Sequence, residues 1–282
     1  MEPKSGIVNI DSKLHINEID FFFTPRKKIF QEIYIPQGEP EMTTLESGFL
    51  CGCLKKYKPQ KILEIGIAAG ATTAIILECM ESLGLDYEMH SIDYLEYFYR
   101  DKQKKSGYLA EDLIKRKQLE NKHKFHLGDI AYNFLPEIGN EVDFVILDTM
   151  HILPGEVLDL ICILPYLKDG AVVVLHDTSL NLYTDNRYCY ANSTVFSSIV
   201  ADKYINYDTD KSENAYPNIG AFIVDKETKN NVNNLFLSLF ISWKYYPDEN
   251  QIKSYKKAID NLYGNTGRYL FEQALKLNKI HL

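Results

Sequence analysis

The chain has 282 residues, of which 45% are hydrophobic and 25% are charged, so it is long enough to bury a full globular core. Its formal net charge of -8 provides no general positive field for a phosphate backbone, and we expect no nucleic-acid partner. No apolar run reaches the roughly 18 residues of a membrane span, so we expect a cytoplasmic protein without a membrane partner. The five cysteines are odd in number and mostly scattered, which predicts neither a disulfide framework nor a zinc site.

In chain order, residues 1–60 form a mixed segment that we expect to act as a lead-in or cap, with a helical pattern around residues 43–57. From residue 61 onward, short apolar runs alternate with longer helical patterns, which is typical of βαβ units in a parallel sheet. The predicted strands cover residues 61–66, 88–93, 124–128, 142–148, 171–176 and 219–225.

Helical patterns connect these strands. One begins at the glycine-rich turn after the first strand, a second covers residues 108–119, and a third opens at Pro154-Gly155. Residues 168–170 predict a turn into the strand at 171–176. Residues 229–243 and 249–278 predict two further helices, with a break at Pro247 and a later turn at 264–267. We therefore predict an α/β fold with a doubly wound, mostly parallel sheet, a core over residues 61–228, and a C-terminal helical extension over residues 229–282.

The most informative segment is KILEIGIAAGATT at residues 61–73, a buried strand followed by a turn of small residues and a helix. Gly66 and Gly70 lie four residues apart, and small residues there allow backbone amides to approach a ligand closely. The spacing differs from the G-x-G-x-x-G dinucleotide fingerprint, because residue 68 is Ala68, and this argues against NAD. The Gly-Lys-Ser/Thr of a P-loop is missing as well, which argues against an ATPase or a kinase.

Glu64, Gly66 and Gly70 match the pattern E-x-G-x-x-x-G, and here the sequence resembles the class I S-adenosylmethionine methyltransferases. The resemblance extends over about residues 45–225 and implies a seven-stranded, Rossmann-like sheet. It implies that Asp93 binds the ribose hydroxyls, for which a carboxylate is a good double acceptor, and that Asp129 lies at the adenine. Alone, these two residues would fit a helix N-cap and a turn, but their register with the glycines favours a cofactor role. The residues predicted to contact S-adenosylmethionine are Glu64, Gly66, Gly70, Thr72, Asp93, Asp129 and Asp148.

Two later strand ends carry titratable side chains, in the sequences LDTMH at residues 147–151 and LHDT at residues 175–178. The carboxyl edge of an open α/β sheet is where ligands bind, so we predict that Asp148, His151, His176 and Asp177 share one site. Methyl transfer is a direct displacement that needs aligned groups and removal of the acceptor's proton. We predict His151 as the general base, with Asp148 beside it, because a neutral imidazole with a pKa near 6.5 accepts a proton at cellular pH. Asp148 and Asp177 also offer the hard oxygen ligands that magnesium prefers.

The Asp-x-x-His pattern followed by His-Asp looks like that of small-molecule O-methyltransferases, including macrocin-type sugar O-methyltransferases. This resemblance implies a metal ion on Asp148 and Asp177, with His151 as the base. Catechol-type relatives have Asp-Asn or Asp-Asp where this chain has His176-Asp177, which leaves the need for Mg²⁺ open. We expect O-methylation of a small hydroxylated acceptor (a sugar, polyol or phenol), with His176 and Tyr183 as substrate contacts. The alternatives are a metal-independent or N-directed small-molecule methyltransferase, and a catalytically silent cofactor-binding scaffold.

Two further features allow more than one interpretation. Residues 35–46 resemble the lead-in that closes over the cofactor in related enzymes, which implies that Thr43 or Glu46 contacts the methionine moiety. The segment fits equally well a loop followed by a helix N-cap at Thr43 or Thr44. Tyrosines are abundant late in the chain, and together with the C-terminal helices they favour a homodimer as well as a pocket wall.

Overall fold

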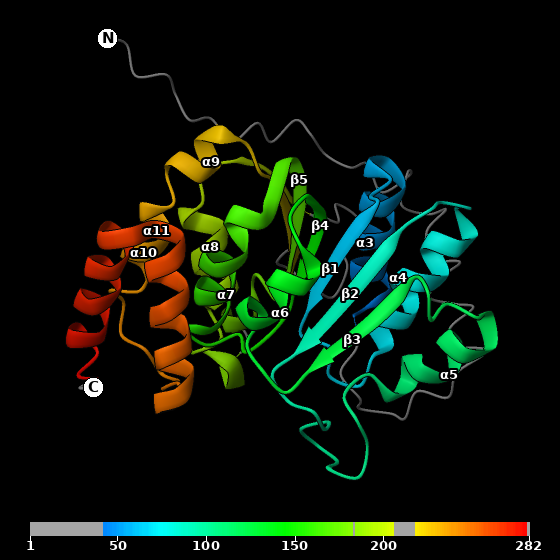
Figure 1. Cartoon of the computed structure of the whole chain (residues 1–282), viewed down its shortest axis with the longest axis horizontal. Helices are drawn as coiled ribbons and strands as arrows, with labels where there is room; N and C mark the ends of the chain where they lie inside the picture. Colours follow the sequence, from blue (N-terminus) through cyan, green and yellow to red (C-terminus); the bar gives the residue numbers. More distant parts are fainter. Residues whose placement is uncertain (1–41, 183, 206–217, 281–282) are drawn as a thin grey trace.

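The computed structural model describes residues 42–182, 184–205 and 218–280, so Tyr183 and most of the predicted lead-in lie outside the described residues. A single twisted sheet lies between two layers of helices (Figure 1). The strands are β1 (Lys61–Ile65), β2 (Glu88–Asp93), β3 (His123–Leu127), β4 (Val142–Leu147), β5 (Leu167–His176), β6 (Asp202–Ile205) and β7 (Ile219–Ile223). The helices are α3 (Thr44–Tyr57), α4 (Ala71–Ser82), α5 (Tyr108–Lys117), α6 (Ala131–Ile138), α7 (Gly155–Ile163), α8 (Ala191–Ser198), α9 (Lys226–Asn230), α10 (Asn233–Ser238) and α11 (Glu249–Leu277).

The sheet order is β3-β2-β1-β4-β5-β7-β6. Strands β1 to β5 pair in parallel, whereas β7 is antiparallel to both β5 and β6. The parallel order reverses direction between β1 and β4, because the chain first builds outward to β3 and then returns to the other side of β1. The predicted doubly wound, mostly parallel seven-stranded sheet is therefore confirmed.

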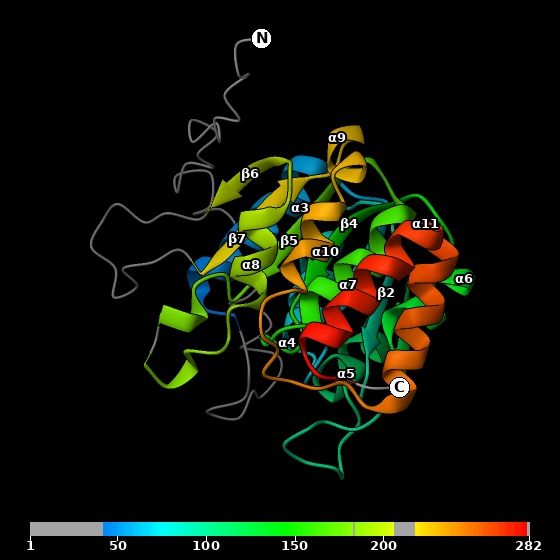
Figure 2. The same ribbon diagram turned by 90° about the vertical axis from the view of Figure 1, so that its left-hand side faces the viewer.

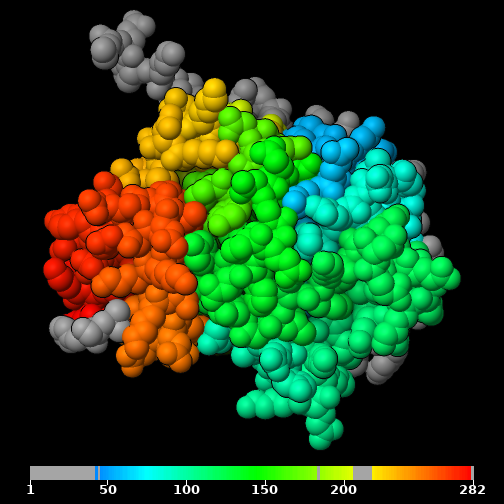
Figure 3. All heavy atoms as spheres, in the orientation of Figure 1, coloured from blue at the N-terminus to red at the C-terminus, as the bar shows by residue number. Residues whose placement is uncertain are grey.

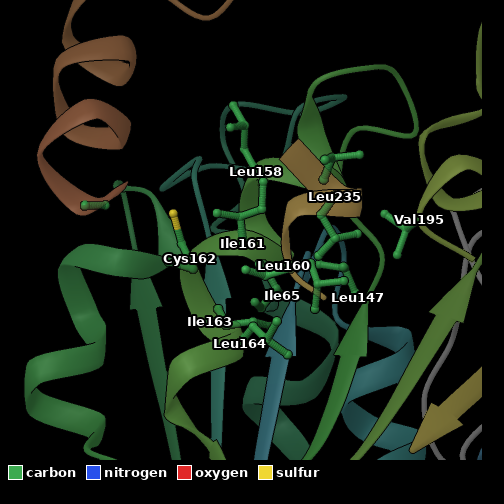
Figure 4. Close-up of a cluster of buried hydrophobic side chains, with 14 of the residues drawn as sticks. Ile65, Leu147, Leu158, Leu160, Ile161, Cys162, Ile163, Leu164, Val195 and Leu235 are labelled. Carbon is green, nitrogen blue, oxygen red and sulfur yellow. The ribbon is translucent and has the colours of Figure 1, made fainter. Parts of the chain in front are cut away.

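Alternating residues of each strand face different helix layers, as the two-residue period of a strand requires. In β1, Leu63 and Ile65 join the apolar cluster that contains α6, α7 and α8, whereas Ile62 joins the cluster that contains α3, α4 and α5. Figure 4 shows part of the first cluster, in which Ile65 and Leu147 of the sheet lie together with leucines and isoleucines of α7. Both faces of the parallel strands are thus buried, which is why these strands are continuously apolar.

The C-terminal extension packs on the same side of the sheet as α7 (Figure 2). Its fully buried side chains include Trp243, Leu235 and Phe271, and these belong to the same apolar cluster as the sheet residue Leu147. In the space-filling view the orange and red C-terminal helices abut the green central part of the chain (Figure 3). The sheet and the extension therefore share one core. No helix of the described residues is both long and apolar enough to cross a membrane.

Several elements differ from the sequence prediction. The turn predicted at residues 168–170 lies inside β5, where Gly170 has a φ of +90° and the register against β4 is irregular. The turn predicted at residues 264–267 is a kink inside α11, at Gly264 with φ 59° and ψ -147°. The sequence analysis did not locate β6, α6 or α8. Strand β6 has no buried residue, so it lacks the apolar face on which strand prediction depends.

Candidate active site

A cavity of about 920 Å³ opens at the carboxyl edge of the parallel strands. Its lining comes from the segments that follow β1 to β5, from the start of α3, and from the first two turns of α11. This is the edge at which open α/β sheets bind ligands, next to the place where the strand order reverses.

The glycines of the turn after β1 permit close backbone packing. Gly66 has a φ of +94°, and a Cβ atom there would lie 1.8 Å from the backbone oxygen of Asp148. Gly70 has a φ of +93°, and a Cβ atom there would lie 2.8 Å from the Cα of Gly107. Any other residue at either position would push the turn away from the neighbouring loops. The two glycines therefore bring the turn against the segments that line the rest of the cavity.

Glu64 lies behind this turn. Its carboxylate is fully buried and accepts a hydrogen bond from Thr73 Oγ1 at 2.7 Å, which links β1 to α4. Burial raises the pKa of Glu64 to about 8. Neither Glu64 nor Gly70 is among the residues that line the cavity, whereas Gly66 and Thr72 are. Glu64 and Gly70 therefore support the turn from behind, whereas Gly66 and Thr72 face the cavity.

Asp93 holds the glycine turn in place. One carboxylate oxygen accepts hydrogen bonds from the backbone amides of Ile67 and Ala68, both at 3.0 Å, and the other accepts from Leu95 N at 2.8 Å. Burial raises the pKa of Asp93, and these three amides act in the opposite direction. Asp129 also lines the cavity, and it accepts from Ile130 N at 2.8 Å at the start of α6. The two predicted cofactor carboxylates therefore face one cavity.

The second predicted group converges as well. His176 Nδ1 lies 3.2 Å from Asp148 Oδ2 and 3.6 Å from Asp177 Oδ2, and His151 Nε2 lies 3.5 Å from Asp177 Oδ2. All four of these residues line the cavity. Burial raises the pKa of Asp148, but attraction to His176 and His151 outweighs it, so the net shift is downward. Burial raises the pKa of Asp177.

His151 is constrained by the first turn of α7. Its backbone N–H donates to Glu156 Oε1 at 2.6 Å, and its ring Nδ1 lies 3.4 Å from the same oxygen without hydrogen-bond geometry. Burial lowers the pKa of His151, but the contact with Glu156 and attraction to Asp148 and Asp177 outweigh it and raise the pKa to about 9. The expectation of an ordinary, neutral imidazole was therefore wrong, because three carboxylates surround the ring and favour its protonated form.

His176 and Glu46 form a buried pair at the floor of the cavity. His176 Nε2 lies 3.4 Å from Glu46 Oε2, and neither ring nitrogen has a hydrogen-bond partner among the described residues. Burial alone would raise the pKa of Glu46, but His176 and neighbouring donors lower it to about 2. Burial lowers the pKa of His176, but Asp148 and Glu46 raise it well above its usual value. Thr43 is the N-cap of α3 and forms a capping box with Glu46, as one of the two interpretations expected. Both residues line the cavity, and their contact with the methionine moiety stays a prediction.

Asp148, His151 and Asp177 each offer one ligand atom within 4.8 Å of the others, which is the one such group of three among the described residues. Two carboxylate oxygens and an imidazole nitrogen are a suitable donor set for a divalent cation. The backbone around it is strained, because His151 and Asp177 are non-glycine residues with φ values of 61° and 55°. Strained residues of this kind cluster at functional sites.

The sequence analysis missed several residues of the cavity. Asn218 donates its amide to Asp177 Oδ1 at 2.7 Å and to Glu46 Oε1 at 2.9 Å. The sequence does hold a signal for Asn218, because this residue directly precedes β7. An antiparallel strand begins at the sheet edge where its parallel neighbours end, so the residue before β7 lies at the carboxyl edge of β5. Glu156, Asp159 and residues around the start of α11 were missed because their positions depend on how helices pack. The residues missed in α11 are Gln251 and Tyr255, whereas the cavity residue Tyr245 is one of the late tyrosines for which a pocket wall was expected.

Part of this chain is similar to known proteins. Residues 63–178 match the family model described as a methyltransferase domain. Solved structures with a similar fold include a methyltransferase from Podospora anserina bound to SAH (15% identity, 74% of this chain and 88% of that chain, TM-score 0.47). A second is the O-methyltransferase TomG from Streptomyces achromogenes in complex with SAM (15% identity, 72% of this chain and 89% of that chain, TM-score 0.47). A third is an O-methyltransferase from Bacillus cereus in complex with SAH (15% identity, 71% of this chain and 91% of that chain, TM-score 0.45). A search of curated proteins found no match. The segment that matches the methyltransferase domain, residues 63–178, covers most of β1 and all of β2 to β5 of the sheet.

Proposed function

We propose that the cavity binds S-adenosylmethionine along the turn after β1 and that the enzyme methylates a hydroxyl group of a small acceptor near His151. The observation that carries this proposal is the joining of two groups in one cavity: the turn held by Asp93, and the cluster of Asp148, His151 and Asp177. A cofactor lying between them would present its methyl group to an acceptor at the cluster.

The cofactor half of the cavity suits the parts of S-adenosylmethionine. Thr72, in the first turn of α4, lines the cavity, and free amides at a helix start favour a carboxylate such as that of the methionine moiety. Asp93 uses three of its acceptor sites for backbone amides, and a carboxylate has about four. One site therefore remains for a ribose hydroxyl. Asp129, at the start of α6, bounds the region that we assign to the base.

The catalytic half suits proton removal from a hydroxyl. His151 Nε2 lies 3.5 Å from Asp177 Oδ2, and both residues line the cavity, so an acceptor hydroxyl beside this pair meets both a base and a carboxylate. Methyl transfer releases a proton, so His151 must be neutral when the acceptor reacts, and the carboxylates around it then stabilise the imidazolium that forms. Asp148 contributes to this stabilisation from 3.8 Å.

The net negative charge of the cluster favours the binding of a divalent cation. Four carboxylates, those of Glu46, Asp148, Glu156 and Asp177, surround His151 and His176, so with both imidazoles protonated the group carries a net charge of two negative units. We assign Asp148 and Asp177 as the residues that would hold Mg²⁺, with His151 kept for the proton. A cation bound there would act as a Lewis acid toward the acceptor hydroxyl.

A metal-independent reaction is the second candidate, and one observation favours it. The buried imidazole of His176 already lies between Asp148 and Asp177, at 3.2 Å and 3.6 Å. A protonated His176 would neutralise part of their charge and orient them without an ion. In that case the two carboxylates position His151 and the acceptor.

The first test is a calorimetric titration with S-adenosylmethionine and with S-adenosylhomocysteine, with NAD as the negative control. We expect saturable binding of both sulfur compounds, and at least tenfold weaker binding to Asp93→Ala, because that variant loses the ribose acceptor and loosens the turn. Asp112→Ala, at an exposed position on α5, is the matched control and should bind like the unsubstituted chain. A folded protein that binds neither compound would rule out the proposed site.

A second assay separates the two mechanisms. Methyl transfer to a panel of sugars, polyols and phenols is measured with Mg²⁺ and with EDTA. Loss of turnover in EDTA and its recovery with Mg²⁺ support the ion at Asp148 and Asp177, whereas unchanged turnover supports the role of His176. Transfer to amines alone would contradict the hydroxyl acceptor.

A further inference from the structure

We propose that Asp159 of α7 and Gln251 of α11 form an adenine-recognition wall, in which Asp159 accepts from the amino group of the ring and Gln251 donates to its ring nitrogen. This inference rests on the proposed binding of S-adenosylmethionine. It assigns a cofactor contact to the C-terminal extension, outside the segment 63–178 that matches the methyltransferase domain.

The start of α11 lies over the part of the cavity assigned to the nucleoside. Its N-cap residue Asp248 accepts a hydrogen bond from Tyr94 OH at 3.3 Å, and Tyr94 directly follows the proposed ribose residue Asp93. Farther along, Asn261 Nδ2 donates to Tyr132 OH at 3.0 Å, which ties α11 to α6, the helix that begins beside Asp129. Two contacts therefore connect α11 to the segments that directly follow Asp93 and Asp129, the residues that bound the nucleoside region.

Asp159 is a buried carboxylate without a cationic partner. It is 8% exposed and lines the cavity. Its oxygens accept from Thr149 Oγ1 at 3.0 Å and from Tyr255 OH at 3.2 Å, and no charged group of the described residues acts on it except the like-charged Glu156. A buried carboxylate is costly unless it is well hydrogen-bonded, and these two donors fill about half of its acceptor sites. A ligand N–H at this wall would fill another.

Gln251 supplies the complementary group. It is 8% exposed and lines the cavity. Its Oε1 accepts from Tyr245 OH at 3.0 Å and from Asp248 N at 2.8 Å, and these two donors fix which end of the amide is oxygen. No described residue accepts a hydrogen bond from its Nε2. The wall therefore pairs one acceptor with one donor, as the amino group and adjacent ring nitrogen of adenine require.

Apolar surface for the faces of a ring lies beside the same part of α7. Gly155 and Asp159 lie four residues apart and thus on one face of the helix. A Cβ atom at Gly155 would lie 2.8 Å from the Cβ of Met150, so the absence of a side chain lets Met150 approach α7. Met150 and the buried Ile130 both line the cavity and offer apolar surface to the faces of a ring.

The test compares S-adenosylhomocysteine with S-inosylhomocysteine, in which an oxo group replaces the amino group and the adjacent nitrogen carries a proton. We expect the unsubstituted enzyme to bind the adenine compound roughly tenfold or more tightly, because the inosine compound places an acceptor against Asp159 and a donor against Gln251. Asp159→Asn should weaken adenine binding by roughly tenfold and reduce or reverse the preference, because the asparagine amide can donate to the oxo group.

Gln251→Leu is the second variant and remains informative if Asp159→Asn fails to fold; it should also lose the preference. Asp112→Asn on α5 is the control and should keep it. An unsubstituted enzyme that binds neither compound overturns the proposed function itself. Binding of S-adenosylhomocysteine with a preference unchanged in both variants overturns only the adenine wall. The adenine wall is also overturned if the two variants show a higher KM for the methyl acceptor and an unchanged affinity for the cofactor, because the wall would then contact the acceptor.

Discussion

The imidazole of His151 is fixed on three sides by carboxylates before any substrate arrives. Its nitrogens lie 3.8 Å from Asp148, 3.4 Å from Glu156 and 3.5 Å from Asp177. Its φ of 61° is unfavourable by on the order of 1 kcal/mol or more for a residue with a side chain, and the hydrogen bond from its amide to Glu156 holds it there. Glu156 is therefore a positioning residue for the proposed base.

Replacing Glu156 by glutamine isolates the charge of this contact. Glutamine keeps an oxygen for the amide of His151 but removes a negative charge beside the ring, so the imidazolium is less stable and the pKa of His151 should fall from about 9 by about one unit. NMR titration of the imidazole measures this directly, with His151→Gln to assign the signal. Glu111→Gln, at an exposed position on α5, should leave the pKa unchanged; an unchanged pKa in Glu156→Gln would contradict the assigned role.

For single residues, the sequence predicted which polar side chains lie together at the carboxyl ends of the strands. Asp93, Asp148 and Asp177 follow apolar strands, and the parallel sheet brings them to one edge. It did not predict Glu156 or Asn218, because the first depends on the position of α7 and the second on a strand from the far end of the domain. Nor did it predict that the pKa of His151 would be raised, since that shift depends on the proximity of Glu156, Asp148 and Asp177 in three dimensions.

Helix α11 is the element that most changes the cavity. It begins with a full capping box, in which Asp248 accepts from the amides of Asn250 and Gln251 while the side chain of Gln251 accepts from the amide of Asp248. Both capping residues therefore also take part in the contacts at the cavity, Asp248 through Tyr94 and Gln251 through Tyr245. The start of the helix and the shape of the wall are set by the same hydrogen bonds.

Asp248→Ala should lower the free energy of unfolding by about 1 kcal/mol, the usual effect of losing an N-cap. Asp248→Asn keeps a capping oxygen and should recover most of this loss, which makes it the matched control. Urea denaturation measures both variants. Equal stability of the alanine variant and the unsubstituted chain would show that the cap does not stabilise α11.

The predictability of an element depended on how clearly it alternates between apolar and polar residues. The break at Pro247 correctly separated α11 from the preceding segment, because proline cannot continue a helix. The edge strand β6 has no apolar face, and α6 contains Pro136 within only eight residues, so neither had a usable pattern. The kink at Gly264 was predicted as a turn, because a glycine in the sequence is compatible with either a turn between helices or a kink inside one helix.

Over the whole molecule, acid stability should be governed by buried histidines on β2 and β3. His90 and His123 are 8% and 5% exposed, and burial lowers their pKa values to about 4 and about 3. The unfolded chain takes up protons on both near pH 6.5 while the folded chain does not, so stability is full above pH 6.5 and falls as the pH decreases below it. The loss is about 2 kcal/mol per histidine at pH 5.

Urea denaturation at pH 7, 6 and 5 measures this slope. His123→Gln removes one titrating ring while retaining a partner for Ser91 Oγ, which lies 2.9 Å from His123 Nε2. The variant should therefore lose less stability between pH 7 and pH 5 than the unsubstituted chain. Equal slopes for the two proteins would show that His123 titrates normally in the folded state.

The position of α11 also constrains the order of events during synthesis. Gln251 and Tyr255 line a cavity whose other walls begin at residue 42. All strands of the sheet and the glycine turn precede α11 in the chain, so they are synthesised before this wall. Trp243 and Phe271, which belong to the same core as the sheet, also follow the last strand. The complete cavity can therefore form only after α11 has been synthesised, so the methyl donor meets its full site later than the sheet is made.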